Sequence, residues 1–68
     1  MTISFGTNLR LLREKRNFSQ EDLARKLQIS RQSISKWEQG ISYPSILYIV
    51  TLTKILDCTL EELLKDLN

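Results

Sequence analysis

The chain has 68 residues, of which 41% are hydrophobic and 26% charged, and its formal net charge is +2. A chain of this size and composition forms one small domain with a limited core, so we expect a single domain over residues 1–68. No stretch is apolar over the roughly 18 residues that a membrane-spanning helix needs, and no cationic start precedes an apolar signal core. We therefore expect a soluble protein in the cytoplasm, without a membrane partner.

The sequence lacks the residues that most catalytic and metal sites require. It contains no histidine and one cysteine, Cys58, which excludes an intramolecular disulfide and suits a reducing compartment. Zinc needs several Cys or His ligands, and a Ser-His-Asp triad needs the imidazole. Two glycines cannot build a Gly-rich phosphate loop. The carboxylates near the C-terminus have the places of solvated acids at a helix start: Asp57, Glu61, Glu62 and Asp66. We expect no enzyme, no catalytic residue, and no cofactor, metal or small-molecule ligand.

Positive charge is concentrated in the first 40 residues. These hold eight Lys or Arg against four Asp or Glu, a net charge of +4, whereas residues 41–68 hold two against four, a net charge of −2. Such an asymmetry can orient a protein on a polyanion. The alternative is an ordinary mixture of solvated charges on small helices.

The first helix is predicted over residues 4–16. Phe5, Leu9 and Leu12 form one apolar stripe, and Gly6 weakens the first turn. Asn17 suits the end of this helix, and Phe18 is expected to be a buried anchor before the next one.

A second helix opens at Ser19. Its hydroxyl can cap the helix while Asp22 reaches back to it, which is the capping-box pattern. Leu23, Ala24 and Leu27 fall on one face of this helix and predict its buried side.

A third helix follows after a gap that only a tight turn can fill. Ser30 is a capping residue, and Gly40 suits a left-handed stop. Ile34 and Trp37, three positions apart, predict the buried face; a base-stacking or interface role for Trp37 is the alternative. The outward face carries Arg31, Gln32, Ser33 and Lys36, with Gln39 near the end. Arg or Lys can pair with guanine and Gln with adenine in the major groove, so the two helices describe a helix-turn-helix.

A fourth helix is predicted to run to about Leu56. Pro44 suits either its first turn or the position before a Ser45 cap. Its expected core face is Ile46, Ile49, Val50, Thr53 and Leu56. A second, largely apolar stripe is Leu47, Tyr48, Thr51 and Ile55. A helix that is apolar nearly all round needs a second surface against which to bury itself.

The capping-box pattern of Thr59 and Glu62 opens a fifth helix over about residues 60–67. Its apolar stripe is Leu60, Leu63, Leu64 and Leu67. Cys58, in the preceding link, is expected to be a small buried hydrophobic residue. With no strand alternation, repeat or linker, the sequence predicts an all-α fold, a compact five-helix bundle with the helix-turn-helix as its second and third helices.

The run SQEDLARKLQISRQSISKWEQG over residues 19–40, followed by YPS and TLEELL, resembles the phage-repressor/Cro-type helix-turn-helix family of transcriptional regulators. The likeness covers residues 9–64, and the ordered set is specific where S-R-Q alone would be weak. It implies a sequence-specific regulator that inserts its third helix into the major groove of double-stranded DNA, acting as a repressor on a palindromic operator. The alternative is a helical protein-interaction module, antitoxin-like or an adaptor, which would predict apolar anchors on the outward face of the third helix.

The same resemblance assigns roles to individual residues. Bases would be read by Arg31, Gln32, Ser33 and Lys36. Phosphates would be held by Ser19 and Gln20 at the start of the second helix, and across the groove by Gln39, Tyr43 and Ser45. Family members often carry Lys or Arg where this chain has Ile41 and Tyr43, so we expect lower non-specific affinity.

Two further features follow from the resemblance. Arg13 and Glu38 match a structural ion pair that ties the first helix to the third and fixes geometry more than it adds stability. Gln28 occupies a left-handed turn position where relatives often have Gly, at a cost on the order of 1 kcal/mol.

Proteins of this kind read two half-sites roughly 34 Å apart, which requires a two-fold dimer. Because the basic half must face DNA, we expect a homodimer through Leu47, Tyr48, Thr51, Ile55, Leu60 and Leu64. The alternative is a fifth helix folded over the fourth, leaving a monomer that dimerises only on DNA. With no ligand-binding domain attached, control is expected from protein concentration, operator overlap or a separate partner protein. A phage, mobile-element, antitoxin or restriction–modification setting is left open.

Overall fold

The computed structural model describes residues 5–65. Between these residues there are five helices and no strand: α1 (Phe5–Lys15), α2 (Gln20–Leu27), α3 (Arg31–Gln39), α4 (Ile46–Ile55) and α5 (Leu60–Leu64). The predicted all-α fold of five helices is confirmed. No helix in the described part of the chain is long and apolar enough to cross a membrane.

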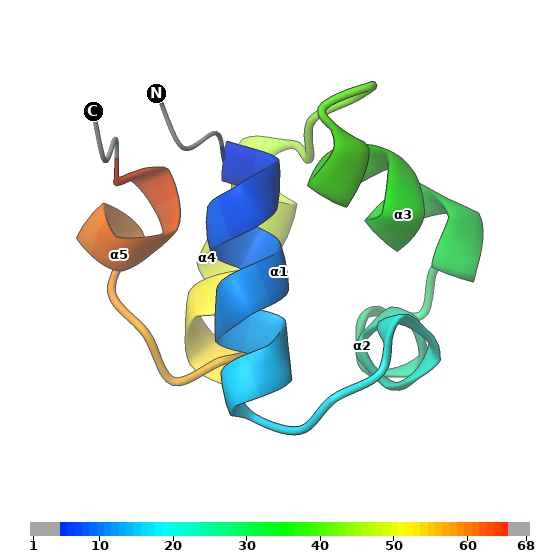
Figure 1. The fold of residues 1–68 in the computed structure, drawn as a ribbon, viewed down its shortest axis with the longest axis horizontal. Coiled ribbons are helices and arrows are strands. Elements are labelled where there is room, and N and C mark those ends of the chain that lie inside the picture. The colour runs from blue at the N-terminus through cyan, green and yellow to red at the C-terminus, as the bar shows by residue number, and fades with distance from the viewer. Residues whose placement is uncertain (1–4, 66–68) are drawn as a thin grey trace.

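The central element is α1. It packs against α3 and against α5, while α2 packs against α3 and α4, and α4 also contacts α5. Figure 1 shows α1 crossing in front of α4, with α5 on its left and α2 and α3 on its right. The helix-turn-helix therefore occupies one side of α1, and α5 covers the opposite side.

Two capping boxes begin helices as predicted. The Ser19 hydroxyl accepts a hydrogen bond from the Asp22 N–H, and the Asp22 carboxylate accepts one from the Ser19 N–H, each at 2.9 Å. Thr59 and Glu62 make the same reciprocal pair at the start of α5, at 3.0 and 2.9 Å. Both boxes satisfy backbone donors that have no partner inside a helix.

Left-handed residues follow four of the five helices. Their φ angles are 61° at Asn17, 60° at Gln28, 77° at Gly40 and 51° at Asp57. Gly adopts this conformation without a Cβ penalty, and Asn and Asp tolerate it. Gln28 is therefore the position in the described chain where this backbone geometry costs most.

The core is one cluster to which every helix contributes. The predicted buried faces of α2 and α3 are confirmed, and Trp37 is 6% exposed, so it is a core residue. The fully buried side chains are Leu9, Leu23, Ile34, Leu52, Leu56 and Leu63.

The predicted core face of α4 is wrong at two positions. Ile46 and Val50 are 73% and 47% exposed, whereas Leu52, which the prediction omitted, is fully buried. Ile55, predicted for the second stripe, packs against the core instead. Because α4 is apolar nearly all round, its periodicity could not indicate which side faces inward. The contacts of α4 with α2 and α5 decide it.

The fifth helix is shorter than predicted. It ends at Leu64, and Lys65 has an extended backbone with φ −59° and ψ 136°. Leu67, and Ser4 at the predicted start of the first helix, lie outside the described residues. Cys58 is half-buried against the core, and this burial raises the pKa of its thiol.

Candidate nucleic-acid interface

The turn between α2 and α3 consists of Gln28, Ile29 and Ser30. Gln28 has the left-handed geometry φ 60°, ψ 42°, as the resemblance implies, and the Ile29 N–H donates to the Ala24 carbonyl at 3.0 Å. Ile29 packs against the core, and the Ser30 hydroxyl accepts from the Ser33 N–H at 3.3 Å. These contacts fix the direction in which α3 leaves α2.

An ion pair fastens α3 to α1. Arg13 Nε donates to Glu38 Oε2 at 2.6 Å, and Arg13 Nη2 donates to Glu38 Oε1 at 3.1 Å. The third guanidinium nitrogen, Nη1, donates to the Phe18 carbonyl at 2.7 Å. The two side chains are only 10% and 4% exposed, and the hydrogen bond with Glu38 raises the pKa of Arg13. The ion pair implied by the resemblance is thus present, and its two-point geometry sets the orientation of α3.

The buried and exposed sides of α3 are clearly separated. Ile34 and Trp37 are 0% and 6% exposed and face the core. Arg31, Gln32 and Lys36, which we predicted to read bases, are all exposed. The helix therefore presents one polar face with hydrogen-bond donors and acceptors to solvent.

Ser33 is less exposed than its predicted role on the outward face requires, and Ser35 makes a contact that was not predicted. Ser33 is half-buried, and its hydroxyl lies 3.1 Å from the Ser30 hydroxyl, so it lies at the edge of the polar face. Ser35, which the sequence analysis did not name, accepts a hydrogen bond from Gln39 Nε2 at 2.7 Å. The helical spacing of four from Arg31 to Ser35 to Gln39 is the signal that could have identified Ser35.

The start of α2 approaches α3. The Ser19 hydroxyl is already an acceptor for the Asp22 N–H, which leaves its own proton and the first N–H groups of α2 as donors. Gln20 is half-buried, and its Nε2 donates to Glu38 Oε1 at 3.1 Å. Gln20 Oε1 lies 3.5 Å from Arg31 Nη1.

Tyr43 and Ser45 lie beyond the C-terminal end of α3, in the link to α4. Tyr43 is 66% exposed, and its ring is 6.1 Å from that of Phe5. Ser45 is the N-cap of α4, and its side chain makes no capping hydrogen bond, so its hydroxyl can serve another partner. Pro44 therefore precedes the cap and does not lie inside the first turn.

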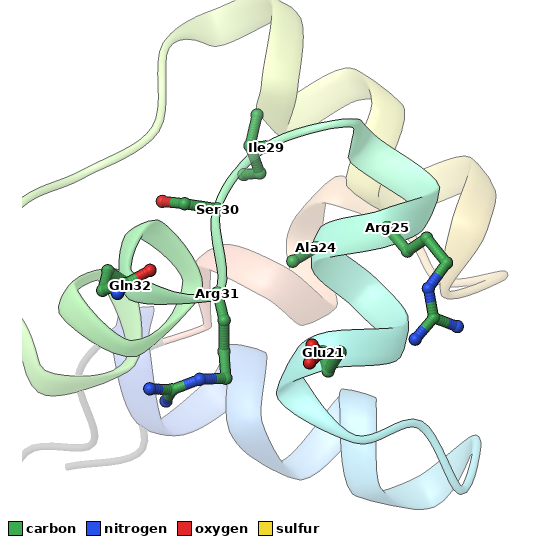
Figure 2. A pocket seen from close by; sticks show the side chains of 7 residues that line it. All are labelled: Glu21, Ala24, Arg25, Ile29, Ser30, Arg31 and Gln32. Atoms are coloured by element: carbon green, nitrogen blue, oxygen red, sulfur yellow. The ribbon is translucent and has the colours of Figure 1, made fainter.

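A cleft of about 480 Å³ lies between α2 and the start of α3. Figure 2 shows Arg31 and Glu21 at one end of it and Ile29 at the other, with Arg25 on the α2 side and Gln32 on the α3 side. Its rim is charged and polar, so it extends the polar face of α3 toward α2.

The predicted dimer surface is only partly exposed. Leu47, Leu60 and Leu64 are 76%, 51% and 52% exposed. Tyr48 is 36% exposed, and its ring lies 5.6 Å from that of the buried Trp37. Of the two other members, Thr51 is exposed and Ile55 packs inward.

Two helices joined by a three-residue turn, the second held by an ion pair and polar on its outer face, define a helix-turn-helix protein. The chain belongs to the helix-turn-helix family, whose sequence pattern matches residues 9–63. Its similarities place it with the phage-repressor/Cro-type transcriptional regulators, a family that is not enzymatic.

Among curated proteins, the chain is 40% identical over 62 residues to the HTH-type transcriptional activator BcrR of Enterococcus faecalis. The match covers 91% of this chain and 30% of BcrR. The chain spans between 30% and 53% of the length of the curated relatives it matches.

Two solved structures share the fold. The P22 c2 repressor, solved in complex with a synthetic operator, superposes with a TM-score of 0.85 at 30% identity, covering 93% of this chain and 96% of the repressor chain. The restriction-modification controller protein C.AhdI of Aeromonas hydrophila superposes with a TM-score of 0.79 at 36% identity, covering 87% and 89%.

Proposed function

We propose that this protein binds double-stranded DNA at specific sequences and regulates transcription, with α3 in the major groove. The observation that carries the proposal is the exposed polar face of α3, opposite the buried Ile34 and Trp37. The likeness to a repressor solved on an operator supports it. An α-helix fits the major groove, where each base pair presents a distinct pattern of donors and acceptors.

Base reading is assigned to the exposed side chains. Arg31 pairs with guanine through two donors, Gln32 pairs with adenine through its amide, and Lys36 donates to guanine. Ser33 contributes from the edge of the face.

Phosphates are held on both sides of α3. On the α2 side, the Ser19 hydroxyl and the backbone N–H of Gln20 donate hydrogen bonds to a phosphate, because the N-terminus of a helix attracts anions. On the α4 side, Gln39, Tyr43 and the uncommitted hydroxyl of Ser45 serve the other strand. The net charge of +4 in residues 1–40, the part of the chain that contains α2 and α3, favours its contact with the negatively charged DNA backbone.

The functional unit is proposed to be a homodimer. Two half-sites one helical turn apart, roughly 34 Å, require two copies of α3 related by a two-fold axis. We assign the dimer contact to a surface made of the exposed leucines of α4 and α5, Leu47, Leu60 and Leu64, with the exposed Tyr48 and Thr51 of α4 as further members. Ile46 and Val50 are exposed on the same helix and enlarge this surface.

Repression is the proposed mode of regulation, because occluding a promoter needs no surface beyond the DNA-binding one. The name of BcrR, a transcriptional activator, makes activation the second candidate. A promoter–reporter assay separates them, since repression lowers and activation raises reporter output when the protein is expressed.

Selection of bound sequences from random double-stranded DNA tests the proposed function. The expected result is a palindromic motif whose half-sites are about 10 base pairs apart, centre to centre. A protein-interaction module without DNA binding would enrich no motif. That outcome would overturn the proposal.

A further inference from the structure

The last helix, α5, is held at its C-terminal end by a side chain of α1. Asn8 is 5% exposed, and its Nδ2 donates to the Leu63 carbonyl at 3.2 Å and also to the Lys65 carbonyl. The two protons of one amide NH2 group thereby satisfy two carbonyls. Because carbonyl oxygens only accept hydrogen bonds, the NH2 group must face them, and the direction of the amide is fixed.

This contact replaces a cap that the other helices build for themselves. A residue with positive φ follows the end of each helix from α1 to α4, whereas Lys65 after α5 has an extended backbone. The final carbonyls of a helix have no partner inside it. In the described chain no left-handed residue brings a backbone N–H to the end of α5, and Asn8 supplies the donor in its place.

Such support matters because α5 is short. Five residues make little more than one turn, and a helix of that length is not stable by itself. Its other anchors include the capping box that begins at Thr59 and the fully buried side chain of Leu63. Removing the Asn8 donors would leave the buried Leu63 carbonyl unpaired, which favours a state in which α5 has left α1.

The position of α5 affects the proposed homodimer. Leu60 and Leu64, four positions apart on one face, are 51% and 52% exposed, while Leu63 is buried in the core. Only a docked α5 presents these two leucines as part of the dimer surface. The helix on which it docks, α1, also holds α3 through the ion pair of Arg13 and Glu38. One helix therefore fixes both the dimer surface and the helix that is proposed to enter the groove.

We propose that Asn8 is a positioning residue for the homodimer. By docking α5 on α1, it sets the distance between the dimer contact and α3, and thereby the half-site spacing that the protein accepts. This rests on the proposed homodimer and its DNA binding. Both protomers must present a docked α5, so the apparent dimer dissociation constant rises with the inverse square of the docked fraction.

Asn8→Asp tests the proposal with a side chain of the same shape. Its carboxylate only accepts hydrogen bonds, so it repels the two carbonyls. In sedimentation experiments the variant should dimerise roughly tenfold to a hundredfold more weakly than the parent, which corresponds to a docked fraction of about 0.1 to 0.3.

DNA binding provides a readout that a general loss of stability would not move. On operators whose half-site spacing differs by single base pairs, the parent should prefer one spacing, and Asn8→Asp should lose that preference. Affinity for DNA with a single half-site should stay within about twofold of the parent, because the ion pair that holds α3 is intact.

Arg16→Met is the matched control, because Arg16 is an α1 side chain that holds the end of a different helix. Its Nε donates to the Leu56 carbonyl after α4 at 2.9 Å. This variant should lower the melting temperature without weakening the dimer, and an equally weakened dimer would overturn the inference. Asn8→Ala only removes the donors, and it should weaken the dimer in the same direction even if Asn8→Asp does not fold. Variants at position 8 that dimerise like the parent would also overturn it.

Hydrogen exchange separates this inference from the proposed function. At a concentration where the protein is monomeric, the amides of Leu63 and Leu64 should exchange faster in Asn8→Asp than in the parent, and those of α3 should not. Raising the concentration should restore their protection in the variant, because dimerisation selects the docked α5. A parent that is monomeric at every concentration would overturn the proposed homodimer and this inference with it. Equal exchange in the two proteins would overturn the inference and leave the homodimer standing.

Discussion

A methyl group at position 6 would lie 2.6 Å from the carbonyl oxygen of Trp37, and it would also overlap the backbone of Glu38. The start of α1 therefore rests directly on the last turn of α3. Only glycine permits this approach, because any Cβ would push the two helices apart. Together with the Arg13–Glu38 ion pair, this contact makes α1 the support on which α3 is held.

Gly6→Ala should destabilise the fold by about 1–3 kcal/mol, the usual cost of adding a group to a packed site. Chemical denaturation followed by circular dichroism measures it. Gly40→Asn is the control: nothing lies within 4 Å of a Cβ there, so it should cost only the strain of the left-handed backbone, which Asn tolerates better than most residues. A variant at position 6 as stable as the parent would show that α1 and α3 can separate freely.

Gln28→Gly should stabilise the protein by about 1 kcal/mol, since glycine relieves the left-handed strain at φ 60°. For a domain of this size, that corresponds to a rise of roughly 4–8 °C in Tm. Gln28→Ala keeps the strain and should give no such rise. Equal melting temperatures for the Gly and Ala variants would mean that residue 28 is not strained.

Acid should weaken the fold through the two capping boxes. The Ser19 N–H holds the pKa of Asp22 below its usual value, and the Thr59 N–H does the same for Glu62. Because both folded-state pKa values lie below the unfolded ones, the stabilisation is fully present above roughly pH 4.3 and is lost as pH falls through the folded values.

Thermal melts between pH 7 and pH 2 measure this effect. The double variant Asp22→Asn, Glu62→Gln should be less stable than the parent at neutral pH and should lose less stability on acidification. Parallel pH profiles for the two proteins would place the acid sensitivity elsewhere.

Arg31→Ala and Gln32→Ala should each lose roughly 1–3 kcal/mol of discrimination at one base position. Both side chains are exposed, so the melting temperatures should stay near that of the parent. Binding to operators with single base-pair changes provides the measurement. A variant that discriminates like the parent at every position would remove its residue from the base-reading set.

Leu47→Glu should turn the proposed dimer into a folded monomer in sedimentation experiments, because it places a charge on a side chain that is 76% exposed. Leu47 is a better site than Tyr48, whose ring packs on Trp37, so that a charge there would also disturb the core. Arg10→Glu, exposed on α1, is the control and should remain dimeric. A parent that is monomeric at high concentration would contradict a stable dimer and would leave the DNA-binding proposal standing.

The helix-turn-helix was readable in the sequence because its signals are local. Ser19 and Asp22 cap a helix from three residues apart, and Ile34 and Trp37 share a face through helical spacing alone. Gly40 ends α3 through its own backbone preference. The all-α fold, the order of the helices and the polar face of α3 follow from such signals.

Only the tertiary structure decided the rest. The inward face of α4, with Leu52 buried and Val50 exposed, depends on where α2 and α5 lie, because its own residues are apolar on nearly every side. The need for Gly6 depends on the Trp37 carbonyl, 31 positions along the chain. The direction of the Gln20 amide depends on the Glu38 carboxylate that α3 brings beside it. Each is set by the distance between groups far apart in sequence, and periodicity carries no record of that distance.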